Sequence, residues 1–279
     1  MKIKYSWIPF VVAFLTLIPL NVCRLFTENK ESQNLILGLS LDVWYLTLLL
    51  VFSLIIIFFV VFSKDSNQSV FSTSTVSDQM LTFIPSIAIF CHTFRNVLMV
   101  IYFPLPKETA DKILFFVEII FGLLVAVVFG AISVGCTVKN EFLKKFSLIY
   151  ILPTVWSGIR LFELFADYKG KAFYNIDMLD LLALGMFTLF FFYQATVFAE
   201  IKSKNNKKKL FIFGMLSIIF AFTYYIGNFV EKIMNNEFEA LLLFPGFVDL
   251  ILGIYVLTYL FKGTINRSEL EEVYEAEER

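Results

Sequence analysis

Eight long apolar runs dominate the sequence and restrict what it can fold into. Each run is close to the roughly 20 residues that a helix needs to cross a bilayer. Apolar residues occupy every helical face of the runs, without the alternation of a membrane β-barrel. Backbone groups in lipid must be bonded within their own segment, which favours helices. The runs cover residues 6–26, 41–63, 80–103, 112–137, 145–167, 177–200, 209–231 and 239–262.

The composition supports this interpretation. Of 279 residues, 58% are hydrophobic and 17% are charged, whereas a soluble domain has about 25% charged residues. We therefore predict an all-α, polytopic transmembrane bundle of eight helices within one domain, residues 1–262. A short acidic cytoplasmic tail, residues 263–279, would follow it. The first run follows MKIK, as in a signal peptide, but it lacks a small-residue cleavage site and is predicted to be a retained helix.

Several function classes are excluded or disfavoured. The chain has one histidine, His92, and three cysteines without metal-ligand spacing, so neither a metal site nor a cofactor is predicted. A net charge of −1 gives no signal for nucleic acid. The sequence also lacks a phosphate-binding loop and the nucleophile motifs of hydrolases. These observations make an enzyme the least favoured class.

Lysine and arginine are distributed unequally between the links that join the runs. Fourteen lie in the N-terminal segment, the even-numbered links and the tail, and six lie in the odd-numbered links. Because cytoplasmic links carry the excess of positive charge, both termini are predicted to be cytoplasmic. The densest group is interpreted as a topology signal in contact with anionic lipid headgroups, rather than a specific binding site. It consists of Lys202, Lys204, Lys207, Lys208 and Lys209.

Charged and polar residues recur in the runs with a regular plan. The odd-numbered runs end in polar residues: Arg24, Arg95, Arg160, and in the seventh run Asn228 and Glu231. The even-numbered runs carry acids in their first half: Asp42, Glu118, Asp177 with Asp180, and Asp249. This plan is compatible with four consecutive helical hairpins, although the unequal spacing of the prolines does not support a duplication.

The same plan places opposite charges in the same half of the bilayer, because odd helices run outward and even helices return. With a rise of about 1.5 Å per residue, Arg95 and Arg160 would lie roughly 10 Å below the outer boundary. Buried charges in lipid are expected to face the bundle interior and to pair. We predict that Arg160 pairs with Asp180 or Asp249, and Arg95 with Glu118.

Two interpretations of these charges remain open. One is a polar cavity, open to the outside, that binds a small polar ligand. The other is a set of interhelical ion pairs that only fix packing. The candidate ligand-binding residues are His92, Arg95, Asn96, Glu118, Trp156, Arg160, Asp180, Asn228 and Asp249. Arg24 and Asp42 lie near helix ends, and we expect their charges to reach the interface.

Small residues in the fourth run, among them Gly122, Ala126 and Gly130, predict a face for a closely packed neighbouring helix. Pro245-Gly246 precedes Asp249 by four residues and is the best candidate for a broken helix at a binding site.

The segment ILPTVWSGIRLFELFADY and the following DMLDLLALGMFTLFFFYQA resemble a group of uncharacterised polytopic membrane proteins of low-GC Gram-positive bacteria. In that group a Leu-Pro-x-x-Trp-x-x-x-Arg helix precedes an acidic helix. The resemblance covers about 50 residues and implies a bacterial plasma membrane. It implies no activity.

Three functions are compatible with the sequence. The first is a small-solute transporter or ligand-binding membrane module whose site is the Arg/acid cluster. The second is a regulatory or scaffold subunit with structural ion pairs and another membrane protein as partner. The third is a lipid-active enzyme in which Glu118 or Asp249 acts while Arg160 holds a phosphate. Access of water to Arg160 would separate the second function from the others.

Overall fold

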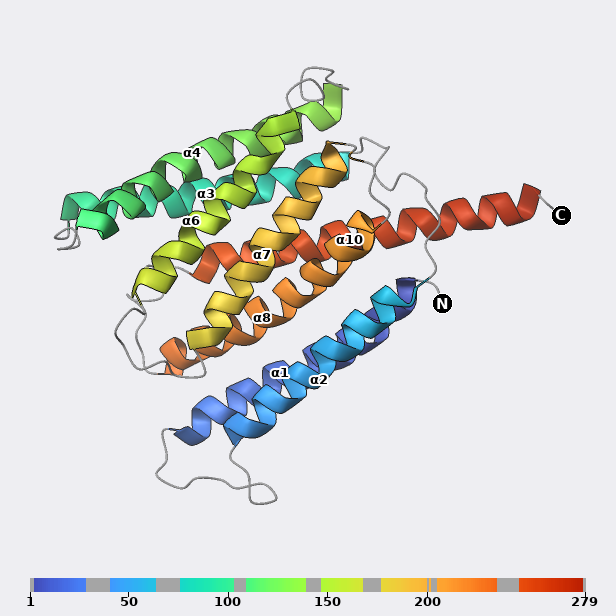
Figure 1. Cartoon of the computed structure of the whole chain (residues 1–279), viewed down its shortest axis with the longest axis horizontal. Helices are drawn as coiled ribbons and strands as arrows, with labels where there is room; N and C mark the ends of the chain where they lie inside the picture. Colours follow the sequence, from blue (N-terminus) through green and yellow to red (C-terminus); the bar gives the residue numbers. More distant parts are fainter. Residues whose placement is uncertain are drawn as a thin grey trace.

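The computed structural model describes residues 3–28, 41–63, 76–102, 109–138, 147–167, 177–199, 201, 205–234 and 246–277. These residues form helices and no strand (Figure 1). Two short 3-10 helices are η1 (Ile3–Ser6) and η2 (Ser147–Ile151). The α-helices are α1 (Trp7–Glu28), α2 (Leu41–Val61), α3 (Val76–Tyr102), α4 (Thr109–Val138), α6 (Leu152–Asp167), α7 (Asp177–Phe198), α8 (Asn206–Met234) and α10 (Gly246–Glu277).

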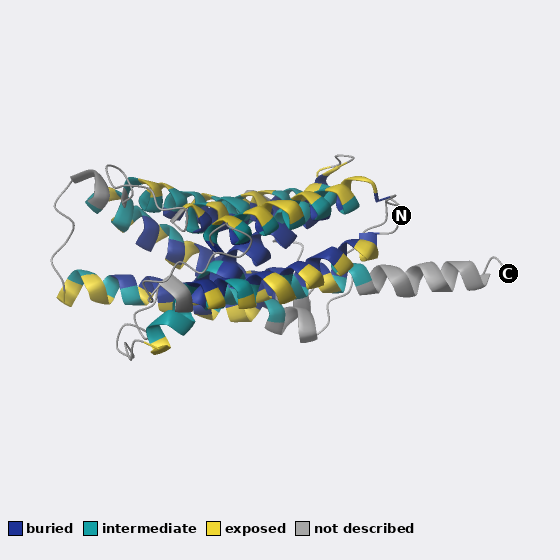
Figure 2. Cartoon of the chain, turned by 90° about the horizontal axis from the view of Figure 1, so that it is seen from below, coloured by how far each residue is buried: buried dark blue, intermediate teal, exposed yellow. Residues whose placement is uncertain are grey.

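Eight helices within the described residues are long and apolar enough to cross a membrane. This finding indicates an integral, multi-pass membrane protein and confirms the predicted all-α bundle. Many large apolar side chains are exposed, among them Leu15, Tyr102 and Val127. Figure 2 shows exposed residues along the outward faces of the helices. Lipid would surround such side chains in the same way that a core surrounds them in a soluble protein.

Helix α8 is the most buried of the eight spans and organises the bundle. It packs against α1, α2, α7 and α10. On the other side, α3 packs against α4 and α10, and α6 joins α4 to α7. Figure 1 shows the α1–α2 pair and the α3–α4 pair on opposite sides of α6, α7, α8 and α10. Because α3 packs against both α4 and α10, and α4 packs against α6, residues of these four helices can meet in one polar region.

Consecutive helices pack side by side in each predicted hairpin: α1 with α2, α3 with α4, α6 with α7, and α8 with α10. Helix α7 also packs closely along α8, which belongs to the next hairpin. The hairpin pairs are therefore not separate packing units, and nothing in the packing tests whether they arose by duplication.

Two predicted helices have different bounds in the structure. The run 145–167 is divided into η2 and α6, with Pro153 in the first turn of α6, where its missing N–H costs no hydrogen bond. The run 239–262 corresponds to α10, which begins at Gly246, directly after Pro245, and continues to Glu277. Residues 239–245 lie outside the described residues. The continuation into the predicted tail follows from a segment without proline and rich in glutamate, a good helix former.

The small residues of α4 provide close contacts, as predicted. The Ser86 hydroxyl on α3 donates a hydrogen bond to the backbone oxygen of Ala126 at 2.7 Å. A Cβ on Gly130 would lie 3.3 Å from the same hydroxyl oxygen. A Cβ on Gly122 would overlap Thr93 Oγ1 and would lie 3.2 Å from Trp156 Nε1. Glycine at position 122 therefore allows α3, α4 and α6 to meet beside the charged residues.

Candidate functional site

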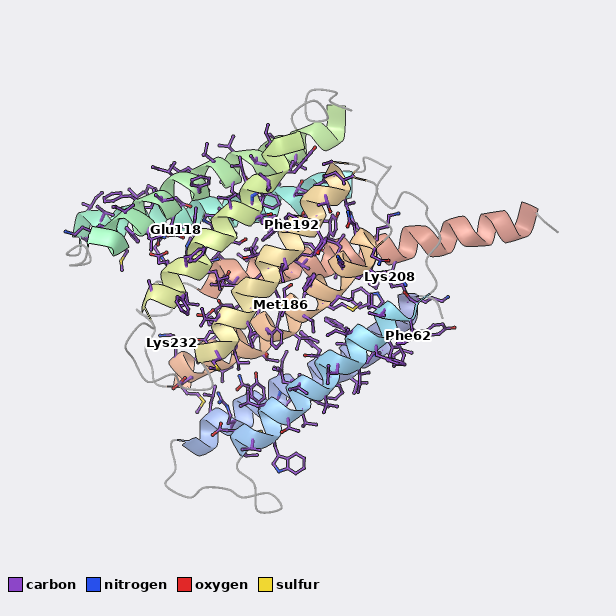
Figure 3. All side chains as sticks on the ribbon, in the orientation of Figure 1. Phe62, Glu118, Met186, Phe192, Lys208 and Lys232 are labelled. Carbon is purple, nitrogen blue, oxygen red and sulfur yellow. The ribbon has the colours of Figure 1, made fainter. Side chains whose placement is uncertain are left out.

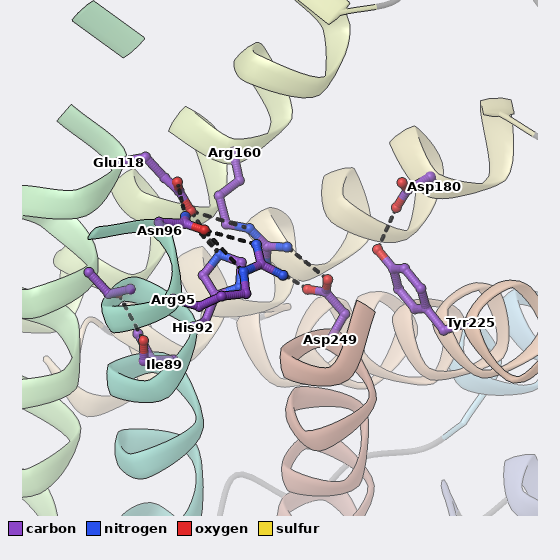
Figure 4. Close-up of polar contacts among 10 residues, drawn as sticks. Ile89, His92, Arg95, Asn96, Glu118, Arg160, Asp180, Tyr225 and Asp249 are labelled. Carbon is purple, nitrogen blue, oxygen red and sulfur yellow. Dashed lines mark hydrogen bonds and ion pairs between the residues drawn. The ribbon is translucent and has the colours of Figure 1, made fainter. Parts of the chain in front are cut away.

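Arg160 of α6 and Asp249 of α10 form a two-point ion pair inside the bundle (Figure 4). The two terminal nitrogens of Arg160 donate to the two carboxylate oxygens of Asp249 at 2.6 and 2.7 Å. Only 9% of the Arg160 side chain and 1% of the Asp249 side chain are exposed. Asp249 is one of the two partners that the sequence predicted for Arg160. The planar fork of arginine suits this paired geometry.

Glu118 of α4 binds the other side of Arg160. Its carboxylate accepts a hydrogen bond from Asn96 Nδ2 at 2.7 Å and lies 3.0 Å from His92 Nε2. Arg160 Nε lies 3.9 Å from the same carboxylate. The short contacts of Glu118 are with His92 and Asn96, and the charge of Glu118 also acts on Arg95, so the predicted Arg95–Glu118 ion pair stays a prediction. Both carboxylates of this region converge on the guanidinium of Arg160.

Arg95 lies at the edge of this group and is half-buried. Its guanidinium donates to Asn96 Oδ1 at 2.8 Å through a terminal nitrogen and at 3.3 Å through Nε. Asn96 thus joins Arg95 to Glu118 through the two ends of its amide. We call the connected set the charged network; its members are His92, Arg95, Asn96, Glu118, Arg160 and Asp249. It links α3, α4, α6 and α10, and its two arginines balance its two carboxylates if His92 is neutral.

Trp156 packs directly against the charged network. The Arg160 guanidinium carbon lies 5.0 Å from the centre of the Trp156 ring, in range of a cation–π interaction. The His92 ring stands edge-on to the same ring at 6.3 Å. Trp156 is fully buried, and its indole N–H has no hydrogen-bond partner in the part of the chain that the structure describes. A buried donor without an acceptor is uncommon and points to a functional or strained site.

Asp180 and Asn228, also predicted for the site, lie outside the charged network. Asp180 of α7 accepts a hydrogen bond from the hydroxyl of Tyr225 on α8, so the predicted alternative partner of Arg160 is bound elsewhere. Tyr225 lies close enough to Asp249 and Arg160 for their charges to act on its hydroxyl. Asn228 is half-buried, and its side chain makes no hydrogen bond to another described residue. Sequence reasoning missed Tyr225, which lies one turn before Asn228 on the same helix.

A second buried cluster surrounds Arg24 of α1. Arg24 donates to Asn21 Oδ1 at 3.0 Å and to Asp42 at 3.1 Å, and it lies over the Tyr45 ring. Asn21 in turn donates to the backbone oxygen of Thr223 on α8. Only 3% of Arg24 is exposed, whereas 41% of the Asp42 side chain is exposed. The guanidinium is therefore buried against other helices, and the expected reach of these charges to the interface stays a prediction. The close approach of α1 to α8, where a Cβ on Gly227 would overlap Asn21 Nδ2, keeps Arg24 inside.

The lysine group is partly used in helix packing. Lys208 donates to the backbone oxygens of Val61 at 2.8 Å and of Ser63 at 2.6 Å, at the end of α2 (Figure 3). This contact places a positive charge at the carboxyl end of a helix, where it is favourable. Lys209 lies 5.3 Å from the centre of the Tyr193 ring. Lys202 and Lys204 lie outside the described residues, and contact of the group with anionic lipid stays a prediction.

Comparisons with known proteins identify no relative, so the function has to be inferred from the geometry of the charged network. No family model, no curated protein and no solved structure matches the chain. Among the described residues, no group of three or more His, Cys, Asp or Glu side chains could hold a metal ion.

Proposed function

We propose that this multi-pass membrane protein binds and transports a small polar solute, and that the charged network is its binding site. The observation that carries the proposal is the Arg160 guanidinium, held between Asp249 and Glu118 inside the bundle. Ionisable side chains inside a membrane are costly, and they commonly mark substrate and ion pathways. The network joins four helices near one end of the bundle, where a change in pairing could alter how the helices pack.

In this proposal the structure represents a closed state, because three charged side chains of the network are almost inaccessible to solvent. The exposed fractions of Arg160, Glu118 and Asp249 are 9%, 3% and 1%. A solute would reach the terminal nitrogens of Arg160 only after the ion pair between α6 and α10 opens. The function therefore requires a second, open state in which water contacts this part of α6.

The open state can be tested with a cysteine at Ser157, one turn before Arg160. Ser157 is 1% exposed, and its hydroxyl donates to the backbone oxygen of Thr154. In a variant without native cysteines, we expect Ser157→Cys to react from outside with a small, membrane-impermeant thiosulfonate in intact cells. Ser217→Cys is the matched control, because Ser217 of α8 is 0% exposed and donates to Gly214 in the same way. This control should stay unlabelled.

A second candidate function is a regulatory or scaffold subunit, and the completeness of the pairing favours it. Arg160, Glu118 and Asp249 already have charged partners within the bundle, and such pairs can serve only to specify packing. Absence of Ser157→Cys labelling under conditions that label an outer link would favour this function over transport. A lipid-active enzyme gains no support, because Asp249 already occupies the two terminal nitrogens of Arg160 that would hold a phosphate.

The proposal includes a plasma membrane location with both termini in the cytoplasm, supported by the distribution of lysine and arginine. We expect a thiol introduced at Ser203, within the lysine-rich link, to be protected from impermeant reagents in intact cells. A thiol at Asn175, in the link before α7, should react. Labelling of Ser203→Cys from outside, with Asn175→Cys protected, would invert the topology.

A further inference from the structure

The carboxylate of Asp249 binds the guanidinium of Arg160 with the geometry expected for the carboxylate of a bound solute. Both of its oxygens lie on the two terminal nitrogens of the guanidinium, at 2.6 and 2.7 Å. Among the described residues, Asp249 makes no other side-chain hydrogen bond. It lies in the first turn of α10, four residues into that membrane span. The two terminal nitrogens of Arg160 are therefore held by a single side chain, which lies near the end of α10.

Glu118, in contrast, is held from several directions. Asn96 and His92 of α3 bind its carboxylate, and Arg160 approaches from α6. Removing Glu118 would take one contact from each of three neighbouring groups, whereas moving Asp249 would free only the two terminal nitrogens of Arg160. The geometry therefore identifies Asp249 as the carboxylate that can be displaced and Glu118 as the fixed counter-charge.

Displacement of Asp249 has a consequence for charge. The groups that face Asp249 are Arg160 from α6, Arg95 from α3 and Tyr225 from α8. Next to these groups lie Glu118 from α4, His92 from α3 and Asp180 from α7. If a solute anion bound the two terminal nitrogens of Arg160 while Asp249 stayed ionised, the network would carry one unbalanced negative charge in a low-dielectric region. Uptake of one proton by Asp249 would restore the balance. A cationic solute would instead face Arg95 and Arg160.

We propose that the solute is a small organic monocarboxylate, which replaces Asp249 on the fork of Arg160 while Asp249 takes up one proton from the outer solution. This inference rests on the proposed function and names its substrate class. The step conserves charge, because one solute anion and one proton enter together. Binding of the carboxylate and uptake of the proton are then two parts of one exchange.

Propionate is a suitable probe for the full chain in lipid nanodiscs. Calorimetry in buffers of different ionisation enthalpy should show uptake of one proton for each propionate bound. The dissociation constant should rise about tenfold for each pH unit. The reason is that each binding event takes up one proton, and the proton concentration falls tenfold for each pH unit. Propionamide, which has a similar shape without the charge, should not bind. Arg160→Lys should weaken propionate binding by at least about tenfold, because lysine lacks the two-point fork.

Asp249→Asn should bind propionate without proton uptake and with little dependence on pH. Asp42→Asn is the matched control: Asp42 is also an arginine-paired carboxylate in the first turn of its helix, bonded to Arg24 outside the network. It should keep the uptake of one proton. If Asp249→Asn does not fold, a binding reaction of the unaltered protein without proton uptake would still overturn the exchange.

The inference and the proposed function can fail separately. Binding of propionate without proton uptake would overturn the exchange at Asp249. Labelling of Ser157→Cys without any propionate binding would overturn the carboxylate class and leave solute transport standing. Failure of both the labelling and the binding would remove the proposed function itself.

Discussion

Replacing Arg160 with leucine is expected to reduce the free energy of unfolding in detergent by about 3–5 kcal/mol, because it leaves two buried carboxylates without their shared partner. Asp249 would lose both hydrogen bonds to the guanidinium, and Glu118 would lose the positive charge 3.9 Å away. Arg160 cannot become neutral by losing a proton and therefore needs a partner where it is buried. Equilibrium unfolding in mixed micelles would measure the loss.

Two further variants separate a structural role of Arg160 from a role in binding. Arg160→Lys keeps the charge and should fold with most of its stability, while losing two-point recognition of a carboxylate. Arg160→Leu combined with Asp249→Leu removes the ion pair as a unit, so much of the lost stability should return. Full cellular function of this double variant would show that the pair only fixes packing. An unchanged stability of Arg160→Leu alone would contradict the burial of its partners.

The sequence was sufficient to predict the helices and the shared depth of the charges. Helix length follows from the bilayer, and position along a helix follows from a fixed rise per residue. Arg160 and Asp249 are 89 residues apart in the chain, yet both lie a short distance from the same end of the bundle. Pairing charges that lie at the same depth therefore predicted two possible partners for Arg160, and one of them, Asp249, is correct.

Depth alone could not determine which helices are neighbours or how each is rotated. Arg95 and Glu118 lie at similar depths on helices that pack together, but α3 presents His92 and Asn96 to Glu118 and leaves Arg95 at the edge. Asp180 has a suitable depth for Arg160, but Tyr225 of α8 is its partner. One tyrosine among 12 in the sequence gave no signal for this contact.

The burial of Arg24 was missed for a related reason. Its position near a helix end suggested that the charge reaches water. The structure instead brings α1 against α8 at Gly227, and Asn21 and Asp42 then supply the hydrogen bonds that Arg24 requires. A contact between the first and seventh spans depends on the packing order of the whole bundle, which a single sequence does not reveal.

Replacing Gly122 with alanine is expected to reduce stability by about 1–3 kcal/mol, as overpacking does in well-packed cores. The added Cβ would overlap Thr93 Oγ1 and would lie 3.2 Å from Trp156 Nε1. Thr93 is 1% exposed, and its hydroxyl donates to the backbone oxygen of Ile89 at 2.8 Å, so it cannot simply rotate away. Helices α3 and α6, which carry His92 and Arg160, would have to move apart from α4. Thermal unfolding in detergent would measure the change.

The control is Gly185→Ala in α7, where an added Cβ would have no atom within 4 Å. Because alanine is a better helix former than glycine, this variant should not lose stability. Thr93→Ala removes the hydroxyl that overlaps the new methyl group, so Gly122→Ala with Thr93→Ala should recover most of the loss. If Gly122→Ala were as stable as Gly185→Ala, the three helices would not be in close contact at this position. The charged network would then lack the rigid support that its short hydrogen bonds require.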